Sequence, residues 1–322
     1  EYGYRDVRPS NLIVDFLGHP YIDLRVCFNS FTPANLSENF ARKLVDHYLL
    51  TLKQHPNLHD KVEFEILFTC LGFDFDLKAE ILRKSRFSEE EIEELKNSLR
   101  RITRRGMERV ESDMNKIRKM EERYDAIMGA RMPDLERVFL LLEDIRSIGI
   151  PCFSHLARNG FVAVTMLKSL ASIGITTKEQ TETFITSIHN IPSMMQEDAE
   201  AVNQSGLSWN QFVKKYGHLR PGSYDITSAC YASSPEEFLR PLLGNQAGRK
   251  PEQSTVWNEE VRTKISQVLQ VNGFDGDVKK FEQFLRKSIE GREFGKFIFT
   301  KNLNASLEIL IKFGANNNLT KE

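Results

Sequence analysis

The chain has 322 residues, and its 44 Lys and Arg almost balance its 45 Asp and Glu, which gives a net charge of -1. A balanced charge produces no global field toward a polyanion or an anionic membrane, so it argues against a general nucleic-acid binder. Hydrophobic residues make up 40% and charged residues 28% of the chain, close to average globular usage. This composition argues against intrinsic disorder.

The cysteines, Cys27, Cys70, Cys152 and Cys230, are widely spaced and form no CxxC motif. Such spacing favours reduced core thiols over a disulfide framework. No apolar stretch is long enough to span a bilayer, and the N-terminus does not resemble a signal peptide. We therefore expect a soluble, cytoplasmic protein. Because the first methionine is Met107, we expect a fragment or a processed product.

Two N-terminal segments show the period-two alternation of half-buried strands. Residues 21–28 place Ile22, Leu24, Val26 and Phe28 on one face, and residues 62–68 (VEFEILF) repeat the pattern. Prolines flank the first segment on both sides. The sequence therefore predicts two strands that belong to one small sheet.

Helical signals dominate from residue 81 onward. Ser88 and Glu91 form a predicted capping box, and an apolar stripe follows at three-and-four spacing. Capping boxes are also predicted for Thr177 with Gln180 and for Ser208 with Gln211. The stripe changes phase near Gly106, where we expect a break. Further helices are predicted at residues 133–147, 154–173, 178–189, 208–216, 257–271, 277–290 and 293–312, and one begins at Pro235. Loops are predicted between residues 217 and 235 and in the polar segment 244–255.

These patterns predict an α+β fold that is predominantly α-helical, with a helical bundle-like domain and a small N-terminal β element. Residues 1–80 would form an N-terminal segment with a small sheet and a helix, and residues 81–322 a helical domain, for which the resemblance described below implies acceptor binding. A single domain for the whole chain stays open.

Several short patterns give weak chemical signals. The segment from Gly291 to Lys296 lacks the spacing of a phosphate-binding loop, and Pro56 between His55 and His59 argues against a two-histidine metal site. No metal ligands are predicted. Asp74 and Asp76 suit acid–base work or magnesium, or a solvated strand end.

Arginines crowd one predicted helical segment, at Arg100, Arg101, Arg104, Arg105 and Arg109. Clustered guanidinium groups suit phosphate recognition because each forks onto two oxygens. A solvated helix face is the simpler interpretation, since the preceding acidic turn partly neutralises the charge.

The loop YGHLRPGSYDI, residues 216–226, concentrates polar groups after a capped helix. Loops on a rigid scaffold are where binding groups accumulate. Arg220 would clamp a phosphate or carboxylate, and His218 and Asp225 would orient it or move a proton. The alternative is a structural turn in which Asp225 caps and Arg220 pairs locally.

The extended loop motif YGHLRPGSYDITS resembles a segment in the middle region of rifampicin phosphotransferases and related phosphoenolpyruvate-synthase-like enzymes. It is closer to the form in phosphoenolpyruvate-utilising proteins encoded with surface-polysaccharide genes. The segments HPYIDLRVCFNSFTPANL, HDKVEFEIL, LARNGFVAVTMLKSL, SIHN and REFGKFIFTKNL look similar to that subfamily in the same order.

The resemblance implies an acceptor-binding and docking region between an ATP-grasp domain and a swivelling phosphohistidine domain of the same polypeptide. ATP and Mg²⁺ would serve the full-length enzyme, with no cofactor bound by this fragment. No histidine here has the Thr-Ser-His-Ala setting of the phosphohistidine, so the fragment alone is not expected to be catalytic. The resemblance implies that a small-molecule acceptor contacts His218, Arg220, Tyr224, Asp225, Arg25, Arg158 and Arg292. The alternative is a non-catalytic helical interaction or scaffold domain.

Overall fold

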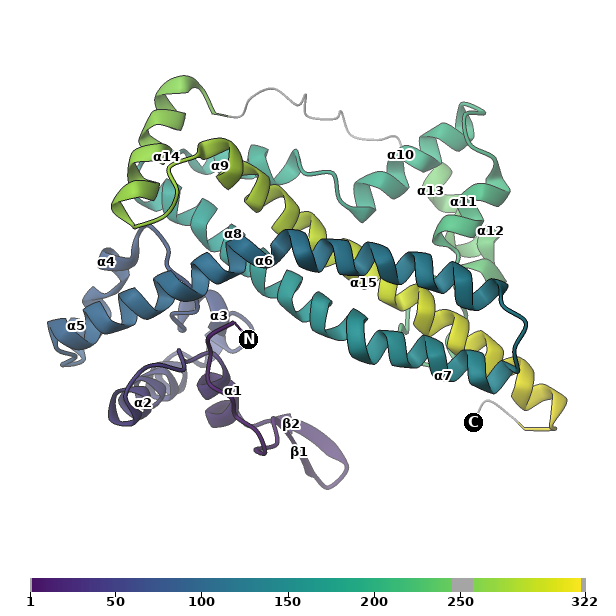
Figure 1. Cartoon of the computed structure of the whole chain (residues 1–322), viewed down its shortest axis with the longest axis horizontal. Coiled ribbons are helices and arrows are strands. Elements are labelled where there is room, and N and C mark those ends of the chain that lie inside the picture. The colour runs from purple at the N-terminus through teal and green to yellow at the C-terminus, as the bar shows by residue number, and fades with distance from the viewer. Residues whose placement is uncertain (1, 245–256, 320–322) are drawn as a thin grey trace. The chain divides into compact units, whose positions relative to one another are not determined.

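The computed structural model describes residues 2–244 and 257–319 (Figure 1). It is 70% helical, with a two-stranded antiparallel sheet near the N-terminus. The predicted α+β, predominantly helical class is confirmed. The predicted loop at residues 244–255 lies, apart from Gly244, outside the described residues.

The chain divides into two compact units, each built from three segments. Unit 1 contains residues 1–108, 161–181 and 257–282, and unit 2 contains residues 109–160, 182–256 and 283–322. The boundary at residue 80 stays a prediction.

Unit 1 begins with a hairpin and continues with helices. Its elements are β1 (Ile13–Phe16), β2 (His19–Ile22), α1 (Leu24–Ser30), α2 (Glu38–Gln54), η1 (Pro56–Leu58), α3 (Val62–Glu65), α4 (Phe75–Lys78), α5 (Glu80–Lys84) and α14 (Glu259–Val271). It also holds the first part of α6 (Glu89–Gly129), the end of α8 (Ile150–Ser172) and the starts of α9 (Lys178–Thr186) and α15 (Val278–Asn316).

Unit 2 combines parts of three long helices with a group of short ones. Besides the remainder of α6, α8, α9 and α15, it contains α7 (Asp134–Asp144), the π-helical turn η2 (Ile145–Gly149), α10 (Ile191–Asn203), α11 (Trp209–Tyr216), η3 (Tyr231–Ser233), α12 (Pro235–Phe238) and α13 (Arg240–Leu243). The short helices α10, α11, α12 and α13 pack together, as Figure 1 shows.

The predicted strand at residues 21–28 is mostly wrong. Strand β2 ends at Ile22, and α1 starts at Leu24 because the Asp23 carboxylate accepts hydrogen bonds from the backbone N–H groups of Arg25 and Val26. Strand β1 pairs with β2 in the register Ile13 opposite Ile22. The hairpin and the residues that flank it are rich in exposed apolar side chains, namely Leu12, Ile13, Phe16, Leu17, Tyr21, Ile22 and Leu24.

The predicted strand at residues 62–68 is also wrong. Residues 62–65 form helix α3, and an irregular, almost wholly buried segment follows at residues 66–74. Buried backbone groups require hydrogen-bond partners, and here hydroxyl groups of three helices accept from the segment's N–H groups. These contacts are Phe68 N to Tyr48 Oη (3.2 Å), Leu71 N to Thr103 Oγ1 (2.9 Å) and Phe73 N to Ser169 Oγ (3.0 Å).

Three predicted helix breaks do not occur. Helix α6 continues through Gly106 and α15 through Gly291, and residues 148–153, between two predicted helices, are helical because η2 leads directly into α8. A Cβ atom at Gly291 would lie 2.9 Å from both Leu156 Cδ2 and Met114 Sδ, so this glycine allows close helix packing. A glycine costs a helix only about 1 kcal/mol relative to alanine, and tertiary packing outweighs that cost here.

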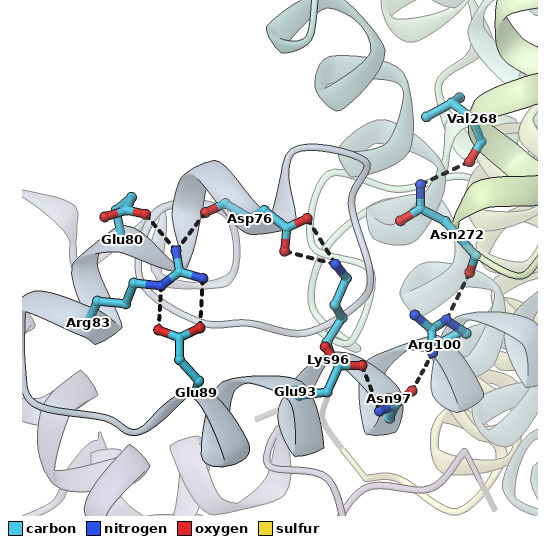
Figure 2. Close-up of polar contacts among 10 residues, drawn as sticks. All are labelled: Asp76, Glu80, Arg83, Glu89, Glu93, Lys96, Asn97, Arg100, Val268 and Asn272. Atoms are coloured by element: carbon cyan, nitrogen blue, oxygen red, sulfur yellow. Dashed lines mark hydrogen bonds and ion pairs between the residues drawn. The ribbon is translucent and has the colours of Figure 1, made fainter.

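The start of α6 is tied to neighbouring elements of unit 1 by polar contacts (Figure 2). Arg83 of α5 forms a two-contact ion pair with Glu89, and Lys96 donates to both carboxylate oxygens of Asp76 at 2.8 and 2.9 Å. Further along, Arg100 Nε donates to the carbonyl oxygen of Asn272 at 2.8 Å. The first turns of α6 are therefore held from more than one side.

None of the helices in the described part of the chain is both long and apolar enough to cross a membrane.

Candidate functional site

A pocket of about 410 Å³ lies in unit 2, beside the loop that follows α11. The start of α10, the loop and α15 supply its lining. Its polar lining residues are Arg220 and Ser223 from the loop and Glu293, Lys296 and Thr300 from α15. The loop singled out by its sequence therefore forms one wall of a cavity.

Helix α11 fixes the start of the loop. Ser208 and Gln211 form the predicted capping box. At the other end, the Tyr216 ring is fully buried and its hydroxyl donates to Asp198 at 2.7 Å. Burial and this carboxylate together raise the pKa of Tyr216 well above its usual range. Tyr216 therefore acts as a neutral hydrogen-bond donor that joins α11 to α10.

Gly217 continues this tight packing. A Cβ atom at this position would lie 2.4 Å from the carbonyl oxygen of Val213 and 2.8 Å from Ala232 Cβ. The backbone N–H of Ala232 donates to the Gly217 carbonyl oxygen at 2.9 Å, so the start of the loop is joined to η3. Only a residue without a side chain fits this contact unchanged.

Arg220 is buried, and all its donors are used within the protein. Its Nε and Nη2 donate to Asn304 Oδ1, Nη2 also donates to Glu308 at 2.8 Å, and Nη1 donates to the carbonyl oxygens of Asp225 (3.1 Å) and Ser228 (3.0 Å). Since a guanidinium group carries five N–H bonds, none is left for a ligand in this arrangement. Arg220 therefore holds the loop against α15, and part of the residue also lines the pocket.

His218 is 9% exposed and packs edge-on against the Phe297 ring, with 4.5 Å between the ring centres. Its Nε2 lies 3.1 Å from the Phe297 carbonyl oxygen, and since a carbonyl can only accept, Nε2 carries the proton. Burial lowers the pKa of His218 to about 4. This histidine is neutral at pH 7 and faces the protein interior.

The other two loop candidates lie at the surface. Tyr224 is 72% exposed. Asp225 Oδ1 accepts from the backbone N–H of Thr227 at 2.8 Å and from its hydroxyl at 2.7 Å, and these hydrogen bonds lower the pKa of Asp225. The Asp225 side chain thus closes a local turn, as the structural alternative for this loop predicts.

The three remaining candidate arginines are spread over the chain. Arg25 belongs to unit 1, where it pairs with Asp46 at 2.8 Å. Arg158 is half-buried on α8, and Arg292 is exposed on α15 with its Nε 3.5 Å from the Glu293 carboxylate. None of the three lines the pocket beside the loop. Of the predicted site residues, Arg220 alone lines it.

Lys296 is the pocket residue that sequence reasoning missed as a binding group. It is exposed, and its amine makes no hydrogen bond or ion pair with any other residue the structure describes. In the sequence, the Gly291 to Lys296 segment indicates only a poor match to a phosphate-binding loop. The segment is instead helical and presents this amine beside the loop.

Other predicted chemical groups are paired. Asp74 pairs with Lys78 at 3.2 Å, and Asp76 with Lys96 (Figure 2). On α6 and α8, the buried Asp113 accepts from Arg109 and lies 3.4 Å from His155. Burial opposes ionisation of Asp113, but hydrogen bonds from His155 and Arg109 outweigh it and lower the pKa. Within residues 2–244 and 257–319, no group of three or more His, Cys, Asp or Glu is arranged to hold a metal.

No family model matches the chain, and neither the curated proteins nor the solved structures contain a significant match. The family resemblance therefore rests on the quoted sequence segments alone.

Proposed function

We propose that the chain is the acceptor-binding and docking region of a cytoplasmic, ATP-dependent phosphotransferase of the phosphoenolpyruvate-synthase type. In this proposal the pocket beside the loop holds the small-molecule acceptor. A swivelling histidine of the same polypeptide, phosphorylated from ATP with Mg²⁺, delivers the phosphoryl group. One observation carries the proposal. The Lys296 amine, which makes no hydrogen bond or ion pair with any other described residue, lies in a pocket that the motif loop lines on one side.

The pocket chemistry supports this proposal. A phosphoryl acceptor needs a cation close to the oxygens on which charge develops during transfer. Lys296 supplies a mobile cation, while the hydroxyl-bearing Ser223 and Thr300 line the same pocket. Arg220 holds the loop rigid, so the polar groups are positioned before the acceptor arrives.

The test uses the complete protein with γ-labelled ATP. We expect label on a histidine and then on the acceptor. Lys296→Ala should leave the histidine labelled but slow the onward transfer. Lys312→Ala is the matched control, because it removes the same charge from an exposed position of the same helix that does not line the pocket. If both variants transfer equally well, the pocket assignment is wrong.

A non-catalytic interaction domain is the second candidate, and the exposed apolar hairpin favours it. Phe16 is 62% and Leu17 98% exposed, which is unusual for side chains of this size. This candidate predicts that the complete protein shows no ATP-dependent labelling of any residue. The same labelling experiment therefore separates the two functions.

A further inference from the structure

A second, smaller pocket of about 270 Å³ lies in unit 1, where α6 passes the N-terminal segment and the turn before α2. Two arginines one helical turn apart, Arg101 and Arg105, line it together with Asn35 and Ser98. No acidic side chain is among its described lining residues. The cavity is therefore positively charged and bordered by neutral hydrogen-bonding groups.

The arginine cluster of α6 divides into three residues that bond to other groups of the protein and two that make one such bond or none. Arg100 and Arg104 donate to the backbone carbonyl oxygens of Asn272 and Gly273, and Arg109 pairs with Asp113. These three guanidinium groups hold protein structure. The five arginines of the cluster therefore do not share one role.

Arg101 and Arg105 differ from the other three. Arg101 makes a single hydrogen bond, from Nη2 to Ser98 Oγ at 3.2 Å, and Arg105 makes no hydrogen bond or ion pair with any residue that the structure describes. Both side chains are exposed at the pocket. Two neighbouring guanidinium groups repel each other unless an anion lies between them, so their placement in one cavity favours an anionic ligand.

Neighbouring residues position the guanidinium groups of Arg101 and Arg105. Asn35 Nδ2 donates to Ser98 Oγ at 2.8 Å, which in turn donates to the carbonyl oxygen of Glu94 at 2.7 Å. Ser98 Oγ therefore receives two donors and is fixed, and it orients Arg101. On the other side, a Cβ atom at Gly3 would lie 2.9 Å from Arg105 Nη1, so the guanidinium lies directly against the N-terminal backbone.

We propose that Arg101 and Arg105 form a binding site for a small oxyanion of the phosphate class. Two planar forks match the oxygens of a tetrahedral phosphate better than a point charge does. The cavity is slightly smaller than a typical drug-sized pocket of roughly 300 Å³ or more, so it suits inorganic phosphate or the phosphate group of a monoester. This site belongs to unit 1 and does not depend on the acceptor pocket or on the transferase proposal.

The test is calorimetric titration of the 322-residue chain with inorganic phosphate at fixed ionic strength, with glycerol phosphate and acetate as separate arms. We expect saturable binding of phosphate. Arg101→Gln with Arg105→Gln should weaken it by about tenfold or more, the effect of losing charge-assisted hydrogen bonds. Arg42→Gln with Lys116→Gln removes the same charge from exposed positions outside the pocket and should leave the affinity unchanged.

The arms separate the possible sources of the anion. Tighter binding of glycerol phosphate than of phosphate identifies a monoester ligand, and the reverse order identifies the free ion. Acetate binding as tight as that of phosphate overturns the phosphate assignment. Equal weakening by both double variants overturns the site, because it shows a general charge effect.

A second measurement needs no variant. Phenylglyoxal modifies accessible arginines, and mass spectrometry can follow each one in the unmodified chain. Phosphate should protect Arg101 and Arg105 but not the exposed Arg42. Equal modification rates at Arg101 and Arg105 with and without phosphate would overturn the proposal even if the double variant failed to fold.

Discussion

Arg220 and Glu308 form an ion pair of 2.8 Å in which the arginine side chain is only 2% exposed. The pair links the motif loop to α15 across 88 positions of sequence. Its arginine also donates to Asn304 and to two carbonyl oxygens of the loop. The most distinctive residue of the motif is therefore a structural brace.

Replacing Arg220 by Ala should destabilise the protein by on the order of 3 kcal/mol, because it leaves several buried acceptors without donors. Arg220→Lys should recover little of this loss, since the single nitrogen of an ammonium group cannot span the acceptors that the three guanidinium nitrogens reach. Urea unfolding measures the change in the free energy of unfolding for both variants. Arg146→Ala, which removes an exposed ion pair with Glu143, is the control and should change stability by less than about 0.5 kcal/mol. An equally small effect at Arg220 would contradict the bracing role.

The burial of His218 should make stability depend on pH. The folded-state pKa of about 4 lies below the ordinary value of 6.5, so the unfolded chain binds the proton first. Stability from this residue is fully present above pH 6.5 and is lost as the pH falls toward 4. The loss should be on the order of 3 kcal/mol, because one pKa unit corresponds to about 1.4 kcal/mol.

His218→Asn should remove this component, which unfolding midpoints between pH 4.5 and 7 would reveal. The variant should have a flatter pH profile than the parent protein over this range. His19→Asn, at an exposed position of the hairpin, should leave the profile unchanged. If stability depended on pH in the same way in His218→Asn and in the parent protein, the His218 ring would become charged in the folded state without loss of stability.

Gly217→Ala should destabilise the loop, because the new methyl group would overlap the Val213 carbonyl oxygen and Ala232. Overpacking of this kind costs about 1 to 3 kcal/mol. Gly129→Ala at the end of α6 is the matched control, since a Cβ there meets no atom within 4 Å. Thermal unfolding should show a lower midpoint for the first variant and an equal or higher one for the second.

Ser169→Ala should cost about 1 to 3 kcal/mol, because it leaves the buried N–H of Phe73 without an acceptor. Thr103→Val should act in the same way on the N–H of Leu71. Thr186→Ala, whose hydroxyl bonds only to its own exposed helix, should have a much smaller effect on chemical denaturation. Three equal values would mean that the hydroxyl groups of Thr103 and Ser169 do not support the buried segment.

Local sequence signals located elements that depend on local interactions. The capping boxes predicted at Ser88, Thr177 and Ser208 are all formed, because each requires only residues three positions apart. Helix α10 has the same kind of cap, from Asn190 to Ser193, but the serine in place of Glu or Gln hid it. The class of fold followed from such signals and from the helical spacing of apolar residues.

Long-range contacts account for the failures. The alternation in residues 62–68 is as compatible with a buried irregular segment as with a strand, and hydroxyl groups 20 or more residues away decide the outcome. In the candidate site, the sequence indicated the loop. It could not reveal that Glu308 and Asn304 accept hydrogen bonds from the Arg220 guanidinium group. The same limitation hid the open amine of Lys296, since its surroundings come from three separate segments.

The buried segment 66–74 has no internal ladder of its own, and three of its N–H groups, those of Phe68, Leu71 and Phe73, depend on side chains from α2, α6 and α8. Fraying of any one of these helices would withdraw an acceptor and admit water to the segment. The amide hydrogens of Phe68, Leu71 and Phe73 should therefore exchange with solvent when the helix that supplies each acceptor opens, so they would report the opening free energies of α2, α6 and α8 in turn.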